Sequence, residues 1–590
     1  MKKILSTAFT FADKTTKFFI KNDDLYIVLV SILIGVLAGY GNIFFRYLIT
    51  ICQDIFYGGS NEAMLYILQK QPFYKILFFP AIGGLLVGLI GTLFKSAKGH
   101  GIPDVIKAVI LNKKIHPVVA LTKTISSSIT IGSGGSAGRE GPIVQIGAAI
   151  GSGVGRLLKF SGNRLKAALA CGAAGGLAST FNAPMGGAMF AAEIIVGEFT
   201  LTTFTPIIVS SVVATVISRA YLGNDVTFIA PAYHLINPVE LVFYALMGFI
   251  LALLGVLFIK FYYFFENRFI SLKIPPFLKP ALGGLLLGII ALYSRRIMGV
   301  GYATIEDILY GRLTADLLFI LIFLKMIATT FTLSSGGSGG LFVPSLLIGA
   351  ATGGFFGSIM HLIFPNITAY SGAYGLVAMS GMLAATMRAP LTSILIIFEI
   401  TQSYEIILPL MLTSIIANFV ANWFENESIF TYTLTKEGVM LKRNVEESIL
   451  SNIKVRDVML KDNLVTFRKQ TPFEDILKSL QKADHMYFPI VDAENNLIGM
   501  LSLDDIKSVL FDESLKKLLL ADDICRKKDL VYINPDNNLN NALGKMVNKD
   551  LGAIPVIQPL NGKLKLVGLL RRSDVMAAYN KAYMSQNVKF

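Results

Sequence analysis

Cysteine is scarce in this sequence, with Cys52, Cys171 and Cys525 the only three among 590 residues. They lie far apart and show neither metal-ligand spacing nor the pattern of a disulfide framework. The sequence also lacks the Lys-Ser/Thr pair of a phosphate-binding loop, and no Ser/His/Asp or metal-ligating set appears in it. These absences argue against an enzyme, and we expect no metal site.

Charged residues are also few, at 16% of the chain against 53% hydrophobic residues, and the mean hydropathy is +0.61. This composition is that of an integral membrane protein whose partner is the lipid bilayer. The formal net charge of +14 does not indicate nucleic acid, because no basic run carries interleaved aromatic residues. Lys and Arg instead flank apolar spans, as in cytoplasmic loops. Residues 1–24 are predicted to form a cytoplasmic N-terminal helix, because Asp13 and Lys14 interrupt any signal-peptide core.

Apolar spans of uniform length are lacking as well. The segments between Leu25 and Trp423 vary in length, and many are interrupted by Gly or Pro. One polar, glycine-rich stretch, Gly132 to Pro142, lies between apolar sequences and contains Glu140. Irregular backbone at membrane depth is tolerated where it lines a cavity, and a carboxylate there indicates a functional site. We therefore expect broken helices around a functional loop.

The apolar part of the chain contains an internal duplication. Residues 130–155 align with residues 332–357 at an offset of about 202, and about half of the positions are identical. Upstream, Gly99-His100-Gly101 matches Gly299-Val300-Gly301. We predict two membrane repeats, residues 25–228 and 229–432. Duplicated halves with broken segments at matching positions indicate a binding site between them, near the membrane midplane.

Short helices that begin inside a membrane present unpaired N–H groups and a partial positive charge at their N-termini. Such starts follow both glycine-rich loops, near residues 139–142 and 341–344. This arrangement suits a small inorganic anion. A cation site would need clustered carboxylates, whereas the apolar spans contain only the widely separated Glu140, Glu193 and Glu399. Close packing at helix crossings is the alternative role for the glycines.

Four motifs, together with the duplication, resemble the CLC family of chloride channels and proton/chloride exchangers over roughly residues 25–440. They are Gly99-His100-Gly101-Ile102-Pro103, Gly138-Arg139-Glu140-Gly141-Pro142, Phe181-Asn182-Ala183-Pro184 and Gly340-Leu341-Phe342-Val343-Pro344. The resemblance implies an all-α polytopic membrane domain with an inverted internal repeat, assembled as a homodimer with one anion pathway per subunit. It implies that Glu140 is the gate, with a structural ion pair to Arg139 as the alternative. The implied anion-binding positions are His100, Gly101, Arg139, Glu140, Gly141, Leu341, Phe342, Val343 and Phe430. Lys123 either adds field at the pathway or anchors the end of a span.

Three positions depart from the family pattern. His100 stands where many members have an anion-coordinating serine, and its imidazole either donates to the anion or turns into a loop. Phe430 replaces the family's pore tyrosine, and Tyr432 could substitute only if the register shifts. Ile194 stands where exchangers carry a proton-relay glutamate, next to Glu193, for which we expect a structural role. Because isoleucine cannot carry a proton, this departure favours passive conduction over coupled exchange.

The last part of the chain has ordinary globular composition. Two similar units, residues 454–519 and 520–590, follow a linker at residues 433–453, and each alternates short apolar strands with helix-period stretches. They resemble a tandem CBS pair, a module in which a Ser/Thr-x-x-Asp motif can hold the ribose of an adenine nucleotide. Ser502 to Asp505 fits that motif, whereas Arg571 to Asp574 fits only at Asp574. A nucleotide-free dimerisation module is the alternative.

These observations together predict a dimeric chloride channel, gated by Glu140 and regulated by the CBS pair. A proton-coupled chloride antiporter of the same fold is the alternative, and a CBS-bearing magnesium channel is disfavoured by the shortage of acidic residues in the spans. We expect chloride as the bound ligand and no required cofactor. The expected location is the plasma (inner) membrane, with the N-terminus and the CBS pair in the cytoplasm.

Overall fold

The structure, a computed structural model, describes residues 23–59, 64–94, 98–224, 231, 233, 235–402, 404–439, 450–451, 453–462, 464–480, 486–510, 518–527, 530–549, 551–560 and 563–587. The N-terminal helix expected at residues 1–24 lies almost wholly outside them. The chain separates into two compact units, Met1–Val439 and Met440–Phe590. The first is helical, and the second combines short helices with strands.

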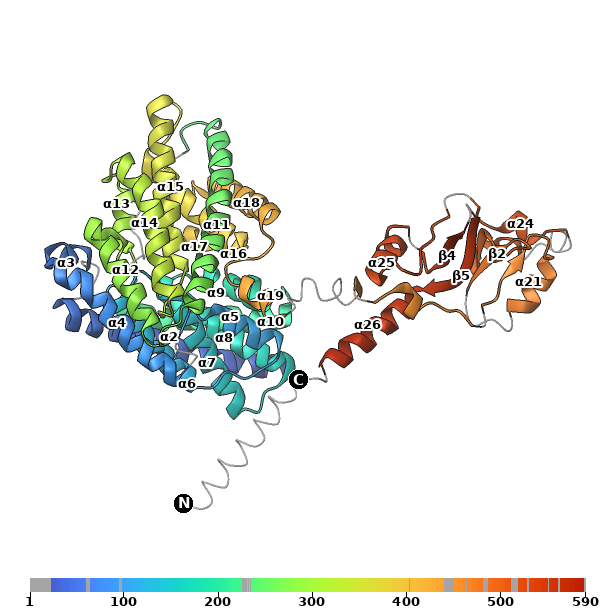
Figure 1. Ribbon diagram of the computed structural model, residues 1–590, viewed down its shortest axis with the longest axis horizontal. Helices are drawn as coiled ribbons and strands as arrows, with labels where there is room; N and C mark the ends of the chain where they lie inside the picture. The colour runs from blue at the N-terminus through green and yellow to red at the C-terminus, as the bar shows by residue number, and fades with distance from the viewer. Residues whose placement is uncertain are drawn as a thin grey trace, which may run out of the picture. The chain divides into compact units, whose positions relative to one another are not determined.

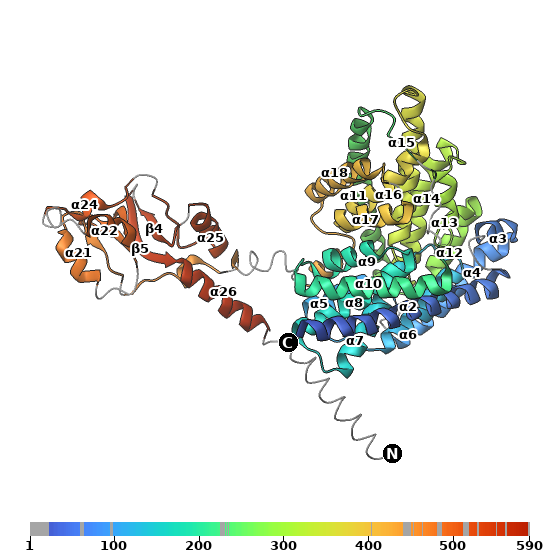
Figure 2. The same cartoon turned by 180° about the vertical axis from the view of Figure 1, so that it is seen from behind.

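The helices of the first unit form two successive sets. The first set contains α2 (Asp23–Tyr57), α3 (Met64–Lys70), α4 (Phe73–Leu93), α5 (Ile102–Ile110), α6 (Val118–Gly132), α7 (Glu140–Leu157), α8 (Gly162–Phe181), α9 (Pro184–Phe190), the π-helix η2 (Ala191–Val196) and α10 (Leu201–Leu222). The second set contains α11 (Glu240–Ser271), α12 (Lys279–Tyr293), the 3-10 turn η3 (Arg295–Ile297), α13 (Tyr302–Leu309), α14 (Ala315–Ser334), α15 (Phe342–Ile363), α16 (Ser371–Met387), α17 (Pro390–Thr401), α18 (Ile407–Phe424) and α19 (Tyr432–Lys436). In Figures 1 and 2 most of the first set, blue to cyan, lies along one side of this unit and most of the second set, green to orange, along the other; α19 lies beside α5 of the first set. Seven of the described helices are long and apolar enough to cross a membrane: α2, α4, α10, α11, α14, α15 and α18.

Each set contains a helix that breaks where the sequence places a proline. Asn182 follows the last residue of α8 and Arg388 that of α16, and both adopt the left-handed conformation, with φ of 60° and 59°. Pro184 and Pro390 then begin α9 and α17, at a position where a missing N–H does no harm. Broken helices were expected from the Gly and Pro interruptions of the apolar spans, and each set contains one.

Two glycines let α4 and α12 cross at close range. A Cβ on Gly84 would lie 2.2 Å from the carbonyl oxygen of Pro280, and a Cβ on Gly284 would lie 2.2 Å from that of Pro80. The two contacts are reciprocal, because each joins a glycine of one set to a proline of the other. The glycines of these two spans therefore serve helix packing, as small residues commonly do in membrane proteins.

The second unit contains two small α/β halves. In the first half, β1 (Phe467–Arg468) runs parallel to β2 (Tyr487–Val491), which pairs antiparallel with β3 (Leu497–Ser502). In the second half, β4 (Ala553–Leu560) pairs antiparallel with β5 (Lys563–Arg571). The helices are η5 (Val455–Asp457), α21 (Phe473–Leu480), α22 (Leu503–Leu510), α24 (Ala521–Ile524), α25 (Leu539–Asn548) and α26 (Arg572–Asn587). One apolar cluster joins the halves and contains Val491, Leu497, Ile557 and Leu566.

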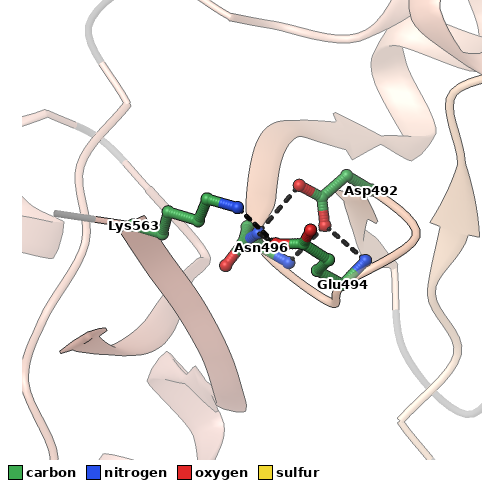
Figure 3. A network of polar contacts seen from close by, with 4 residues as sticks. All are labelled: Asp492, Glu494, Asn496 and Lys563. Carbon is green, nitrogen blue, oxygen red and sulfur yellow. Dashed lines mark hydrogen bonds and ion pairs between the residues drawn. The ribbon is translucent and has the colours of Figure 1, made fainter. Parts of the chain in front are cut away.

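A polar network fixes the hairpin between β2 and β3 against β5 (Figure 3). The Asp492 carboxylate accepts hydrogen bonds from the main-chain N–H groups of Glu494 and Asn496, at 2.9 and 2.8 Å, and from Asn496 Nδ2 at 2.8 Å. Lys563, at the start of β5, donates to the Glu494 carboxylate. This bond lowers the pKa of Glu494 and raises the pKa of Lys563. The network therefore connects the two halves by charge beside their shared apolar cluster.

Candidate functional site

The two glycine-rich loops of the first unit meet through main-chain hydrogen bonds. The N–H of Gly138 donates to the carbonyl oxygen of Gly340 at 2.8 Å, and the N–H of Gly340 donates back to Gly138 at 2.6 Å. The turns at Gly99 and Gly299 each donate to the glycine-rich loop of the opposite repeat, at 3.1 Å. Residues that the duplication relates in sequence are therefore neighbours in space.

Two buried lysines hold those turns. Lys123 Nζ donates to the carbonyl oxygen of Gly99 at 2.5 Å, and Lys325 Nζ donates to that of Gly299 at 3.1 Å. Both side chains are fully buried, and the two lysines are separated by the same offset of 202 that relates the repeats. Lys123 thus binds the main chain of the turn. Lys325 was not among the predicted residues, although the offset could have identified it.

Two helix N-termini abut at the centre of this arrangement. α7 begins at Glu140 and α15 begins at Phe342, and neither start has a side-chain cap. The first-turn N–H groups of each helix have no partner within the helix. A Cβ on Gly141 would lie 2.5 Å from the carbonyl oxygen of His100 and 3.0 Å from Gly340 Cα, so main chain meets main chain here. The junction brings together these predicted positions: His100, Gly101, Arg139, Glu140, Gly141, Leu341, Phe342 and Val343.

The Glu140 carboxylate is fully buried at this junction. Its Oε1 accepts a hydrogen bond from the Tyr302 hydroxyl at 2.9 Å, and the main chain of Val343 lies against the carboxylate. The Arg139 guanidinium stacks over the Tyr302 ring, 4.9 Å from its centroid. A carboxylate at two helix N-termini occupies the place that a small free anion would take. Tyr302 was not predicted, although it directly follows Gly301 of the repeated turn.

An aromatic cluster lies on the other side of the His100 turn. The His100 ring is 6.0 Å from the Tyr262 ring and 5.8 Å from the Phe430 ring, centroid to centroid. His100 is only 6% exposed, and its Nδ1 has no hydrogen-bond partner among the described residues. Tyr432 instead stacks on Tyr263 at 4.2 Å. The structure thus places Phe430 beside His100, together with a tyrosine, Tyr262, that the sequence did not indicate.

Ile194 lies in the π-helix η2, which packs on α5 and α8. The carboxylate of its neighbour Glu193 accepts hydrogen bonds from the main-chain N–H and the hydroxyl of Thr392, at 2.8 and 2.6 Å. Thr392 belongs to the first turn of α17. Glu193 therefore caps a helix of the other repeat.

The two aspartates predicted in the second unit are both engaged. Asp505 Oδ2 accepts bonds from the Ser502 hydroxyl and N–H, at 2.5 and 2.9 Å, and its Oδ1 accepts from Arg526 at 2.8 Å. Burial by itself would raise the pKa of Asp505, but the bonds from Ser502 and Arg526 bring it below its usual range. Asp574 accepts two bonds from the Arg571 guanidinium, at 2.8 and 2.7 Å. Asp574 also lines a cavity of about 320 Å³ together with Arg456, Lys461 and Arg571.

Comparisons with known sequences support this organisation. The profile described as "Voltage gated chloride channel" matches residues 83–422, and the profile described as "CBS domain" matches residues 455–512 and 521–581. "Chloride channel protein CLC-f" of Arabidopsis thaliana is 29% identical, over 93% of this chain and 80% of its own length. "Voltage-gated ClC-type chloride channel ClcB" of Escherichia coli is 29% identical, over 70% of this chain and 99% of its own length.

Solved structures share the fold. The crystal structure of a slow cyanobacterial Cl⁻/H⁺ antiporter aligns with a TM-score of 0.64 at 23% identity, covering 71% of this chain and 99% of that chain. The crystal structure of a eukaryotic CLC transporter aligns with a TM-score of 0.58 at 21% identity, covering 93% and 98%. The expected helical polytopic fold with a small α/β region is thereby confirmed. The channel profile spans more than half of the sequence, so this integral membrane protein belongs to the CLC family of voltage-gated chloride channels and carries a C-terminal tandem pair of CBS domains.

Proposed function

We propose that this protein conducts chloride passively, through the junction where α7 and α15 begin, and that Glu140 is its gate. One observation carries the proposal: the buried Glu140 carboxylate lies against the starts of both helices, one from each repeat. In this position a carboxylate competes with chloride for the same donors. When the carboxyl group is protonated or swings away, the seat is free for a halide.

The donors in this proposal are mostly main-chain N–H groups. The first turns of α7 and α15 supply them, from Arg139, Glu140, Gly141, Leu341, Phe342 and Val343. His100, Gly101 and Phe430 line the next part of the pathway. The imidazole of His100 supplies a donor in place of a serine hydroxyl, and Phe430 supplies none. Each helix terminus contributes about 0.3–2 kcal/mol, so both are needed to hold an ion away from water.

Ile194 favours conduction over exchange, because an isoleucine cannot carry a proton. We propose conduction, and the deciding experiment is the reversal potential of the full chain in liposomes under opposed chloride and proton gradients. A potential that follows the chloride gradient alone supports the channel. A shift of the potential with pH at fixed chloride supports proton-coupled chloride exchange. Exchange is the second candidate because the cyanobacterial structure of the same fold is a Cl⁻/H⁺ antiporter.

For the second unit we propose regulation by an adenine nucleotide at the CBS pair. The cavity beside Asp574 presents Arg456, Lys461 and Arg571, which suit phosphate groups. Asp505, in its Ser-x-x-Asp motif, is the proposed ribose partner in the other half. Titration of the full chain with ATP tests this proposal. The variants Asp505→Asn and Asp574→Asn should each weaken ATP binding. A titration of the wild-type chain that releases or absorbs no heat of binding would contradict the proposal.

We also propose a homodimer in the plasma (inner) membrane, with residues 1–24 and the CBS pair in the cytoplasm. The proposed domain boundaries are membrane repeats at 25–228 and 229–432, a linker at 433–453, and CBS units at 454–519 and 520–590. Helix α18 offers an exposed apolar stripe for the partner subunit: Leu408, Met411, Ile415, Phe419 and Trp423. Cross-linking of an Ile415→Cys variant in membranes tests this interface. A monomer on cross-linking and on light scattering would contradict it.

A further inference from the structure

Tyr302 is held in place by the main chain around it. It is the first residue of α13 and follows Gly301, whose φ of 103° is in the left-handed region. The turn before it is fixed by the Lys325 ammonium, which donates to two carbonyl oxygens, of Ile297 at 3.0 Å and of Gly299 at 3.1 Å. The N–H of Gly299 is bonded to the glycine-rich loop of the first repeat. A side chain that begins from so constrained a turn is well suited to position another group.

The group that Tyr302 meets is the Glu140 carboxylate. Among the described residues, the Tyr302 hydroxyl is the one side-chain donor that hydrogen-bonds Glu140, at 2.9 Å. A hydroxyl donates more strongly to an ionised carboxylate than to a neutral carboxyl group, because the charge shortens and strengthens the bond. The bond therefore favours the ionised form of Glu140 in its buried position.

The charged groups around this pair act in the same direction. The Arg139 guanidinium lies over the Tyr302 ring and is the charge next to Glu140, and Arg46 on α2 interacts electrostatically with the Tyr302 hydroxyl. The start of α15 adds no charge: its main chain at Val343 lies against the carboxylate, and its first residues, Leu341, Phe342 and Val343, are apolar. Both arginines favour a polarised phenol, and Arg139 also attracts the carboxylate.

We infer that Tyr302 is the latch of the gate: its hydroxyl holds ionised Glu140 in the anion seat and so sets the pH at which the pathway opens. The inference rests on the proposed role of Glu140. Protonation of Glu140 weakens the bond, so the side chain leaves the seat. Removal of the hydroxyl weakens the closed state at every pH. Tyr302 is thus a positioning residue that acts through Glu140 and does not itself bind the ion.

The test measures chloride flux against pH in liposomes for the full-length wild type, Tyr302→Phe, Glu140→Gln and the double variant. Tyr302→Phe removes one oxygen and keeps the ring under Arg139. Loss of a hydrogen bond to the ionised carboxylate makes protonation of Glu140 roughly tenfold easier. The pH of half-maximal flux should therefore rise by about one unit. Flux in Glu140→Gln should be independent of pH, and adding Tyr302→Phe should leave it unchanged. Tyr244→Phe is the control, because Tyr244 is a buried tyrosine of the same unit that stacks on Tyr374.

The outcomes separate the latch from the gate. If Glu140→Gln keeps the wild-type pH profile, the gate proposal fails. If Glu140→Gln loses the pH dependence but Tyr302→Phe matches the wild type, the latch is wrong and the gate stands. A change in flux when Tyr302→Phe is added to Glu140→Gln would also overturn the latch, since the hydroxyl would then act elsewhere. If Tyr302→Phe does not fold, Glu140→Asp replaces it: its shorter side chain loses the Tyr302 bond and should shift the profile in the same direction, and an unshifted profile overturns the latch.

Discussion

Glu193 and Glu399 cap each other's repeats. Glu193 accepts from the first turn of α17, at Thr392 N and Oγ1, and Glu399 accepts from the first turn of α9, at Met185 N and Gly186 N, 2.9 and 2.6 Å away. The two acids thus occupy equivalent positions in the two repeats, and each caps a helix of the other repeat. An anion near a helix N-terminus satisfies free N–H groups and complements the helix dipole. These two acids therefore connect the halves, unlike Glu140, for which we propose gating.

Replacement of Glu399 by Gln should lower stability without altering gating. The neutral amide accepts more weakly from Met185 and Gly186, and loss of a cap costs about 0.5–2 kcal/mol. Thermal unfolding of the purified chain in detergent measures this, with Glu437→Gln as the control because Glu437 is half-exposed and pairs with Lys107. A lower midpoint with an unchanged pH profile of flux is expected. A changed pH profile at wild-type stability would count against a structural role.

Gly141 and Gly153 should respond oppositely to alanine, although both lie in α7. A Cβ at Gly141 meets the His100 carbonyl oxygen at 2.5 Å, whereas a Cβ at Gly153 meets only Pro117, at 3.8 Å. Gly141→Ala must push two main-chain segments apart, at a cost of about 1–3 kcal/mol or more. Gly153→Ala should gain up to about 1 kcal/mol from helix propensity. Chloride flux and the thermal unfolding midpoint are measured for both variants. Wild-type values of both for Gly141→Ala would refute the close approach at the junction.

Replacement of Phe430 by tyrosine should raise the affinity for chloride. The Phe430 ring lies beside His100, whose Nδ1 has no partner among the described residues, so Phe430→Tyr adds a donor to the proposed pathway. A hydrogen bond to a charged group contributes about 1.5–3 kcal/mol, which corresponds to roughly a tenfold lower half-saturating chloride concentration. Tyr432→Phe is the control, because Tyr432 stacks on Tyr263. If Tyr432→Phe weakened chloride affinity instead, Tyr432 would be the pathway residue.

Asp505 makes the stability of the CBS pair depend on acidity. Its pKa in the folded chain lies below the ordinary value, so its stabilising contribution is complete above about pH 4 and is lost as the pH falls through the folded-state pKa. Asp505→Asn should therefore lower the unfolding midpoint of this unit at pH 7, and the gap to the wild type should narrow toward pH 3. Asp475→Asn, at an exposed ion pair with Lys478, should show no such narrowing. A gap for Asp505→Asn that stays constant with pH would contradict the assignment.

The sequence predicted those parts of the site that local chemistry specifies. Pro184 and the glycines around Glu140 constrain the backbone wherever they occur, so the helix break and the loop were identified from them. The offset of 202 between the repeats relates the two glycine-rich loops in the sequence alone. Tyr302, Tyr262 and Lys325 were missed because they lie on ordinary helices, and only tertiary packing brings them to Glu140, His100 and Gly299. Nothing in the sequence next to Tyr302 indicates that its hydroxyl will hydrogen-bond the Glu140 carboxylate.

The central claim is that Glu140 and a halide compete for one seat at the starts of α7 and α15. Anomalous diffraction from crystals of the Glu140→Gln variant soaked in bromide tests it most directly, with wild-type crystals treated identically. We predict a bromide peak within hydrogen-bonding distance of the main-chain N–H groups near Gly141 and Val343 in the variant, and no peak in that position in the wild type. A peak there in both proteins, or a variant peak far from these N–H groups, would contradict the account.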